Sequence, residues 1–243
     1  MIPKVIHYIW LGGTKKPNLV NICIKSWKEK LPDYEIIEWN EKNLDIDKIA
    51  RENKFFAECR KRKLWAYMAD YLRLKILYEN GGIYFDTDVE VEKNLDDLLN
   101  QPYIIGFENK NEVSSAVIGC EKENELIKKI WDFYQERIWN EHIYVITHIM
   151  TKVIKEIEKQ SKQNIKIYSK DYFSPIEYQE CYSDSCLTEN TYTIHWFNAS
   201  WNDKKEIHTF LEIKHIRNPI KKKILIIKKT LGYYYRKLKK RVI

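Results

Sequence analysis

The chain has 243 residues, of which 44% are hydrophobic, 14% aromatic and 32% charged. This length suits one large domain, or one domain with an appendage, and the apolar content is sufficient for a core. Seven glycines and six prolines exclude collagen-like and low-complexity architectures, and the aromatic content excludes a mostly disordered chain. We expect no transmembrane segment and no secretory signal, and therefore a cytoplasmic location.

The charge is distributed unevenly along the chain. The net charge is +7, but residues 214–243 contain twelve lysines and arginines and no acidic residue, which leaves −5 on residues 1–213. This contrast predicts a mildly acidic body, residues 1–213, and a basic tail, residues 214–243, that has an anionic partner of its own. The five cysteines have no metal-binding spacing, so we expect free thiols.

The first quarter of the chain alternates between predicted strands and helices. Residues 2–10 are an apolar strand that ends at the glycine turn Gly12-Gly13, and a helix begins at Pro17 and ends near residue 31. A second strand covers residues 34–39, and a polar helix covers about 45–60. This order predicts an α/β fold with a mostly parallel central sheet flanked by helices.

The middle of the chain has the clearest pattern. Apolar residues recur at helical spacing from Leu64 to Glu79, and Gly81-Gly82 turns the chain into the short apolar strand Ile83-Tyr84-Phe85. Further strands are expected at 103–107, 115–119, 165–169 and 192–197, and further helices at 123–138 and 145–160.

Two acidic residues, Asp86 and Asp88, follow this strand two positions apart. Strand geometry places both on one face together with Tyr84, and Ile83 and Phe85 on the other. Two carboxylates at the carboxyl end of a strand can hold Mn²⁺ or Mg²⁺, with water and a bound diphosphate as the other ligands. The alternative is a turn that begins a loop.

A second triplet of the same kind, Asp45-Ile46-Asp47, is expected to cap a helix instead. Upstream of the strand, Asp70 and Arg73 lie three residues apart and share a helix face. They form either an internal ion pair between helix and sheet or a set of polar groups that contact sugar hydroxyls.

These motifs in this order resemble glycosyltransferase family 32. The matching runs are Ala69–Arg73 and Gly81–Asp88 in the centre, Ile2–Trp10 with Gly12-Gly13, Ser26-Trp27, Pro32-Asp33-Tyr34 and Trp39-Asn40 at the start, and Ile194-His195-Trp196 with Ser200-Trp201 at the end. The family contains capsular-polysaccharide and mannosyl-type transferases and is related to the catalytic cores of large glucosylating toxins. The resemblance covers about residues 2–201.

The resemblance implies a single-domain, Rossmann-like fold of the GT-A type and a metal-dependent transferase that retains anomeric configuration. It implies a UDP- or GDP-sugar donor and a glycan or lipid-linked oligosaccharide acceptor, in the synthesis of capsule or another surface polysaccharide. No nucleophile stands out in the sequence, so we prefer front-face attack by the acceptor within a tight ion pair.

The resemblance also implies roles for individual residues. The catalytic residues would be Asp70, Arg73, Asp86 and Asp88. The nucleotide-sugar-binding residues would be Trp10, Gly12, Asn43, Asp70, Arg73, Tyr84, Asp86, Ser200 and Trp201. Asp88 would bind the metal directly, Asp86 would act on it through water, and His195 would stand beside them. Residues 139–150 lack the family's Gly-Pro signature and contain His142 and His148 instead, so no acceptor residue is assigned there.

The basic tail predicts an amphipathic helix that begins at Asn218-Pro219. One side would carry Ile220, Ile224, Ile227, Leu231, Tyr234 and Leu238, and most lysines and arginines would lie elsewhere around the helix. Such a helix would bind an anionic membrane surface and make the enzyme peripheral on the cytoplasmic face. The alternatives are a solvated helix packed on the body, and nucleic acid, which the active-site motifs do not favour.

Two rival functions fit parts of the pattern. Phosphatases of the haloacid-dehalogenase type also have an acidic triplet after an apolar strand, but theirs is the first strand, whereas two strands precede Asp86 here. A membrane-bound scaffold with a degenerate nucleotide-sugar site is the non-enzymatic alternative. The intact set Asp70, Arg73, Asp86 and Asp88 argues against it.

Overall fold

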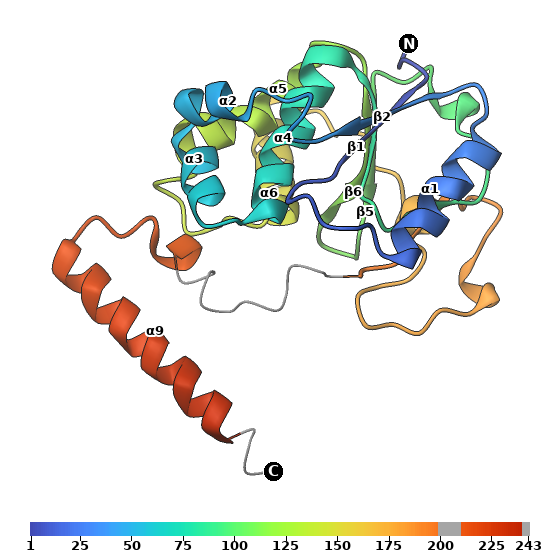
Figure 1. Cartoon of the computed structure of the whole chain (residues 1–243). Helices are drawn as coiled ribbons and strands as arrows, with labels where there is room; N and C mark the ends of the chain where they lie inside the picture. Colours follow the sequence, from blue (N-terminus) through green and yellow to red (C-terminus); the bar gives the residue numbers. More distant parts are fainter. Residues whose placement is uncertain (199–209, 240–243) are drawn as a thin grey trace.

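A mixed five-stranded sheet lies at the centre of the part of the chain that a computed structural model describes, residues 1–198 and 210–239 (Figure 1). Its strand order is β2 (Glu35–Trp39), β1 (Val5–Ile9), β3 (Gly82–Phe85), β6 (Val113–Cys120), β5 (Tyr103–Phe107). The pairs of β1 with β2 and β3 are parallel, and β6 is antiparallel to both β3 and β5. Four of these five strands therefore run in one direction, and only β6, which follows β5 through a short hairpin, opposes them.

Helices cover both faces of the sheet, as the sequence predicts. One apolar cluster joins the sheet to α4 (Trp65–Asn80), α5 (Glu125–Asp132) and α6 (Ile146–Ser161), and a second joins it to α1 (Asn18–Lys30). Tyr84 belongs to the first cluster, whereas Ile83 and Phe85 belong to the second. The alternation predicted for the strand before the acidic pair is therefore confirmed.

The predicted helix at 45–60 is two helices, α2 (Ile46–Glu52) and α3 (Lys54–Lys61). Asn53 separates them because its backbone is extended and its side chain accepts a hydrogen bond from the backbone N–H of Phe56, which caps α3. The Asn53 amide also donates to the carbonyl oxygen of Tyr134 at 3.0 Å. Asp45 caps α2 through the N–H of Lys48, as predicted for this second acidic triplet.

Two other segments differ from the prediction. The helix expected at 123–138 is α5 followed by a π-helical turn, η2 (Phe133–Arg137). The strand expected at 165–169 is wrong, because only Tyr168 forms a bridge, to Gly106. Short helical turns complete the described body: η1 (Asp96–Leu98), α7 (Lys170–Phe173) and η3 (Asp184–Cys186).

The strand expected at 192–197 is β7 (Thr193–His195), and it lies outside the main sheet. It pairs antiparallel with β4 (Val89–Val91), a strand that the sequence analysis did not predict, and Val89 is the partner of His195. This pairing brings β7 next to the residues that directly follow the acidic pair.

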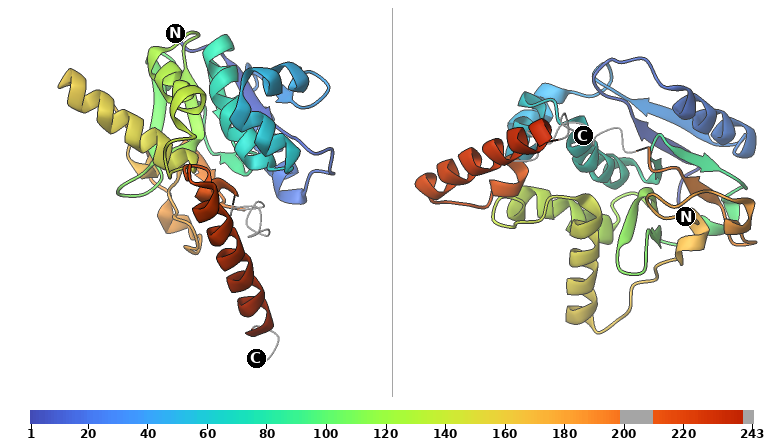
Figure 2. Two further views of the ribbon diagram at one scale, coloured as in Figure 1. Left: turned by 90° about the vertical axis from the view of Figure 1, so that its left-hand side faces the viewer. Right: turned by 90° about the horizontal axis from the view of Figure 1, so that it is seen from below.

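The C-terminal helix α9 (Pro219–Lys239) extends away from the body (Figure 2). Asn218 caps it by accepting a hydrogen bond from the N–H of Lys221 at 3.0 Å. Just before it, Leu211, Ile213 and Lys214 are buried, and the Lys214 amine donates to the carbonyl oxygen of Ile143. None of the helices in the described ranges has the length and hydropathy required to span a bilayer.

Candidate functional site

The acidic pair lies in a turn between β3 and β4. The N–H of Asp86 donates to the carbonyl oxygen of Ala116 on β6, and the N–H of Val89 donates to the carbonyl oxygen of Asp86. The alternation of the strand therefore ends at Phe85, and a four-residue turn brings Asp88 back beside Asp86. A turn and an acidic cluster, which the sequence analysis treated as alternatives, are both present.

Asp86, Asp88 and His195 form a cluster that can hold a metal ion. Each offers one ligand atom, and these atoms lie within 4.8 Å of one another. His195 is buried, its Nε2 lies 3.6 Å from Asp88 Oδ1, and its Nδ1 has no hydrogen-bond partner among the described residues. Two carboxylates and an imidazole suit Mn²⁺ well, and the carboxylates also suit Mg²⁺. The donor set therefore fits the cation that the sequence predicts.

The charges of Asp88 and His195 stabilise each other. Burial acts to raise the pKa of Asp88, but the side chain of His195 and the N–H of Asn198 lower it overall. Burial acts to lower the pKa of His195, but Asp88, Asp86 and Glu108 raise it overall. Asp88 and the other two carboxylates therefore favour the protonated form of His195, and a metal ion would compete with that proton for the imidazole.

Arg73 connects the helix α4 to this cluster. Its guanidinium donates to Asp70 Oδ1 at 2.8 Å and to the carbonyl oxygen of Ser115 at 2.8 Å, and it lies 3.1 Å from Asp86 Oδ1. It also lies over the ring of Tyr84, whose hydroxyl donates to Asp86 at 2.9 Å. An internal ion pair and a role in the site are thus compatible for Asp70 and Arg73, because the Arg73 guanidinium of this pair also contacts Asp86.

The Asp70–Arg73 pair is held in a buried, apolar environment. Asp70 and Arg73 are only 7% and 5% exposed. Burial raises the pKa of Asp70 although Arg73 opposes the shift. Arg73 stays cationic because Asp86, Tyr84 and Asp70 outweigh the effect of burial on its pKa. The guanidinium of Arg73 is therefore shared between the carboxylates of Asp70 and Asp86.

Glu108 is a residue near the site that the sequence analysis missed. It is half-buried, follows the last residue of β5, accepts a hydrogen bond from Ser114, and interacts electrostatically with His195 and Asp86. Burial raises the pKa of its carboxyl group. The sequence indicates a role for Glu108 only through its position directly after a predicted strand. Because β5 and β3 end at the same edge of the sheet, this position lies near Asp86.

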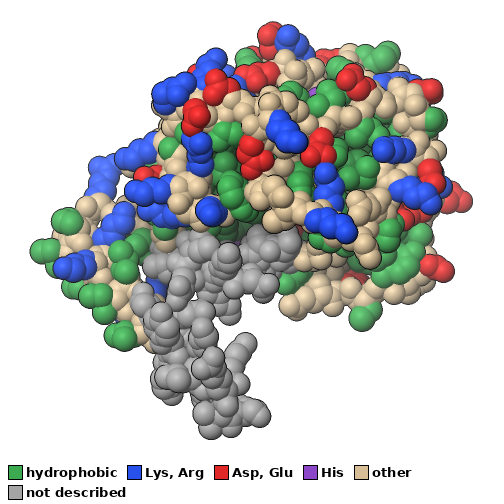
Figure 3. All heavy atoms as spheres, viewed as in Figure 1, with side chains coloured by type: hydrophobic (Ala, Val, Ile, Leu, Met, Phe, Trp, Pro, Cys, Tyr) green, Lys and Arg blue, Asp and Glu red, His purple; other side chains and the backbone are tan. Residues whose placement is uncertain are grey.

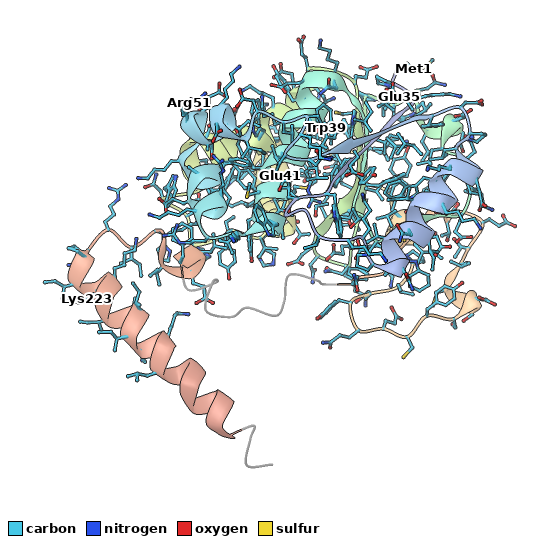
Figure 4. All side chains as sticks on the ribbon, viewed as in Figure 1. Met1, Glu35, Trp39, Glu41, Arg51 and Lys223 are labelled. Atoms are coloured by element: carbon cyan, nitrogen blue, oxygen red, sulfur yellow. The ribbon has the colours of Figure 1, made fainter. Side chains whose placement is uncertain are left out.

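The end of β1 forms the neighbouring part of this edge. The Trp10 indole is partly exposed and donates to the carbonyl oxygen of Thr14 at 2.8 Å. Gly12 has a φ of +89°, and a Cβ atom there would lie 2.9 Å from Nε1 of Trp65. Its N–H donates to Glu41, which follows β2 and is labelled in Figure 4.

Trp65, also absent from the predicted set, lines a cavity of about 340 Å³ beside the glycine turn. The other lining residues are Glu41, Leu44, Asp45, Ile46, Asp47, Arg60 and Met68. The side chain of Asn43 holds the loop after β2, since it donates to the carbonyl oxygen of Glu38 and accepts from the N–H of Asn40. Ser200 and Trp201 lie outside the described residues.

Comparison with known proteins finds a family model that matches the first half of the body. Residues 17–105 match the model of the family described as glycosyltransferase sugar-binding region containing DXD motif. The chain is 25% identical over 177 residues to subversion of eukaryotic traffic protein A of Legionella pneumophila, covering 60% of this chain and 27% of that protein. It is 29% identical over 149 residues to inositol phosphoceramide mannosyltransferase 3 of Schizosaccharomyces pombe, covering 60% and 41%. The chain thus spans less than half the length of these two relatives.

A solved structure shares the fold. The PaToxG glycosyltransferase superposes with a TM-score of 0.53 at 20% sequence identity, over 66% of this chain and 71% of that one. The predicted α/β fold of the GT-A type is therefore confirmed, and so is the resemblance to the DXD-containing transferases.

Proposed function

We propose that this chain, a member of the DXD-containing glycosyltransferases through residues 17–105, transfers a sugar from a UDP- or GDP-sugar to a glycan or lipid-linked oligosaccharide. The observation that carries the proposal is the cluster of Asp86, Asp88 and His195, with Arg73 bound to the same Asp86. An acidic metal site joined to a buried arginine suits a nucleoside diphosphate, because both the cation and the guanidinium attract its phosphates.

We propose that the reaction depends on Mn²⁺ or Mg²⁺, held directly by Asp88, with His195 beside it and Asp86 acting through water. When bound, such an ion stabilises the negative charge that develops on the departing diphosphate. Arg73 adds positive charge on the same side of the site. Tyr84 fixes the orientation of Asp86 by its hydrogen bond, and Asp70 accepts from a sugar hydroxyl.

We propose retention of anomeric configuration by front-face attack. A double displacement requires a carboxylate that can attack the sugar carbon. Asp70 and Asp86 are both bound to the guanidinium of Arg73, and Asp88 is paired with His195. A carboxylate that is already ion-paired is a weak nucleophile, and burial raises the pKa of Glu108, the other acidic residue near the site, which disfavours its anionic form. Both facts favour direct attack by the acceptor while the leaving diphosphate is still present.

We propose that the acceptor belongs to the synthesis of capsule or another surface polysaccharide at the cytoplasmic face of the membrane. A lipid-linked acceptor is supported by the name of the fission-yeast relative, which acts on inositol phosphoceramide. A thermal-shift screen of UDP- and GDP-sugars with Mn²⁺ identifies the sugar and the base of the donor. Transfer assays with the donor that stabilises the protein then identify the acceptor.

The substitution Asp88→Asn tests the proposed function. We expect turnover of the donor to fall about a hundredfold or more at fixed Mn²⁺, because the substitution removes a charged metal ligand. Asp47→Asn is the matched control, since it changes the second acidic triplet, where Asp47 is exposed and pairs with Arg60. Sugar transfer by Asp88→Asn within a few-fold of wild type would show that the metal assignment is wrong.

A further inference from the structure

The helix α9 exposes an apolar stripe. Ile220, Ile224, Ile227 and Leu231 are 70%, 58%, 51% and 65% exposed. Isoleucine and leucine side chains at spacings of four, three and four residues lie along one side of a helix, within a sector of roughly 60°. Figure 3 shows hydrophobic and basic side chains next to each other on the first turns of this helix.

The stripe faces away from the rest of the protein. Among the positions of α9 whose burial the structure describes, the partly covered ones are Lys222, Leu225, Lys229 and Gly232, and Lys229 forms an ion pair with Glu212. At about 100° per residue these positions lie on the side opposite the stripe. A helix that only packed on the body would turn its apolar side inward, so α9 is oriented for a contact with something else.

Basic residues lie next to the stripe. Lys221 and Lys228 lie on one side of it and Lys223 on the other, and all three are exposed. Lys223 lies on the part of α9 that projects from the body (Figure 4). Residues 214–243 contain no acidic residue. The surface therefore combines hydrocarbon with flanking positive charge, which matches the acyl chains and phosphates at a membrane interface.

We propose that α9 binds the surface of an anionic phospholipid membrane by inserting the stripe of Ile220, Ile224, Ile227 and Leu231, with the flanking lysines on lipid phosphates. A second copy of the chain is less suitable, because two such helices would bring a large positive charge together. Nucleic acid would use the lysines but would leave the stripe exposed to water. The proposal concerns where the protein binds and is independent of the chemistry at the Asp86–Asp88–His195 cluster.

Sedimentation of the full chain with vesicles tests the proposal. We expect binding to vesicles of phosphatidylcholine mixed with phosphatidylglycerol, and much weaker binding to phosphatidylcholine alone. Changing Ile220, Ile224 and Ile227 together to Ser is expected to reduce the partition coefficient roughly tenfold or more, since the acyl-facing hydrocarbon is lost. Each exposed lysine changed to Gln is expected to reduce it about fivefold, and less at high salt.

Ile226→Ser is the matched control. Ile226 is 41% exposed on the same helix but lies off the stripe, so this variant is expected to sediment like wild type. Circular dichroism establishes that each variant is folded. Wild-type protein that stays in the supernatant, equal losses for Ile226→Ser and the triple variant, or a dimer that the triple variant dissociates would each overturn the proposal. Transfer to a soluble acceptor is expected to be unchanged by these substitutions, which separates this test from that of the active site.

Discussion

The buried guanidinium of Arg73 gives a quantitative test of how the site is held together. Changing Arg73 to Met preserves much of the aliphatic volume but removes every hydrogen bond that the side chain donates. The carboxylates of Asp70 and Asp86 and the carbonyl oxygen of Ser115 then lose this donor together. Because Asp70 is 7% exposed, water cannot readily replace the lost partner.

The expected cost follows from this burial. Removing one partner of a buried ion pair destabilises a protein by about 3–5 kcal/mol, since the remaining charge is uncompensated. In a chain of this size each kcal/mol lowers the melting temperature by about 2–4 °C, so we expect a fall of about 6–20 °C. Arg60→Met is the matched control, because its ion pair with Asp47 is exposed and should contribute about 0–1 kcal/mol.

The pH dependence has a definite sign. Burial raises the pKa of Asp70 above its usual value of 3.8, and removing Arg73 raises it further. A carboxyl group with a raised pKa in the folded state binds its proton more tightly there, so stability is lost as the pH rises through that pKa. The destabilisation of Arg73→Met should therefore be smaller in mildly acidic buffer than at neutral pH.

Urea unfolding of wild type, Arg73→Met and the double variant Asp70→Asn/Arg73→Met measures these terms. The double variant is expected to recover part of the loss, because the buried carboxylate is replaced by a neutral amide. The reasoning is refuted if Arg73→Met unfolds within about 1 kcal/mol of wild type at neutral pH, or if its loss grows as the pH falls.

Two further predictions concern the donor side of the site. Gly12→Ala should weaken binding of the nucleotide sugar and lower the free energy of unfolding by roughly 1–2 kcal/mol, because φ is +89° and the new Cβ would lie 2.9 Å from Trp65. Calorimetric titration measures the binding and thermal unfolding measures the stability. A variant that matches wild type in both would show that this backbone strain is absent. The raised pKa of His195 predicts that Mn²⁺ affinity, measured by calorimetry, rises with pH from mildly acidic to neutral solution as the imidazolium loses its proton. In His195→Gln this slope should be lost, and a slope as steep as that of wild type would contradict the role of the imidazole.

The elements that the sequence predicts correctly are those whose signals are local. The helix α4, the glycines at 81–82 and the strand β3 are contiguous, and their periodicities change at the glycines. Gly81 and Gly82 have φ values of +69° and +96°, a backbone that glycine adopts readily. This is why the placement of Asp70 and Arg73 on one helix, directly before the strand that leads to Asp86, could be predicted from the chain alone; the roles of these residues stay predictions.

The elements that the sequence predicts wrongly or misses have partners that are distant in the sequence. Residues 45–60 keep a helical pattern, but Asn53 interrupts it by capping α3, and a further hydrogen bond ties its amide to Tyr134, 81 residues later. Residues 165–169 have the composition of a strand, yet only Tyr168 finds a partner. The strand β4 is three residues long and exists because β7 pairs with it. Glu108 belongs to no motif and is near the site only because β5 ends there.

The candidate metal site, Asp86, Asp88 and His195, combines residues that are close in the sequence with one that is distant. Arg73 and Asp86 are 13 residues apart and are brought together by one helix, one glycine turn and one strand. Asp88, in contrast, is held by the residues that follow β7. The backbone N–H of Trp196 donates to its carbonyl oxygen at 3.0 Å, and the N–H of Asn198, 110 residues later, donates to its carboxylate at 2.8 Å. The pairing of β4 with β7 is therefore what holds His195 beside Asp88. The acidic triplet alone would be a turn, and only the pairing of β7 with β4 brings the His195 imidazole and the N–H of Asn198 to it.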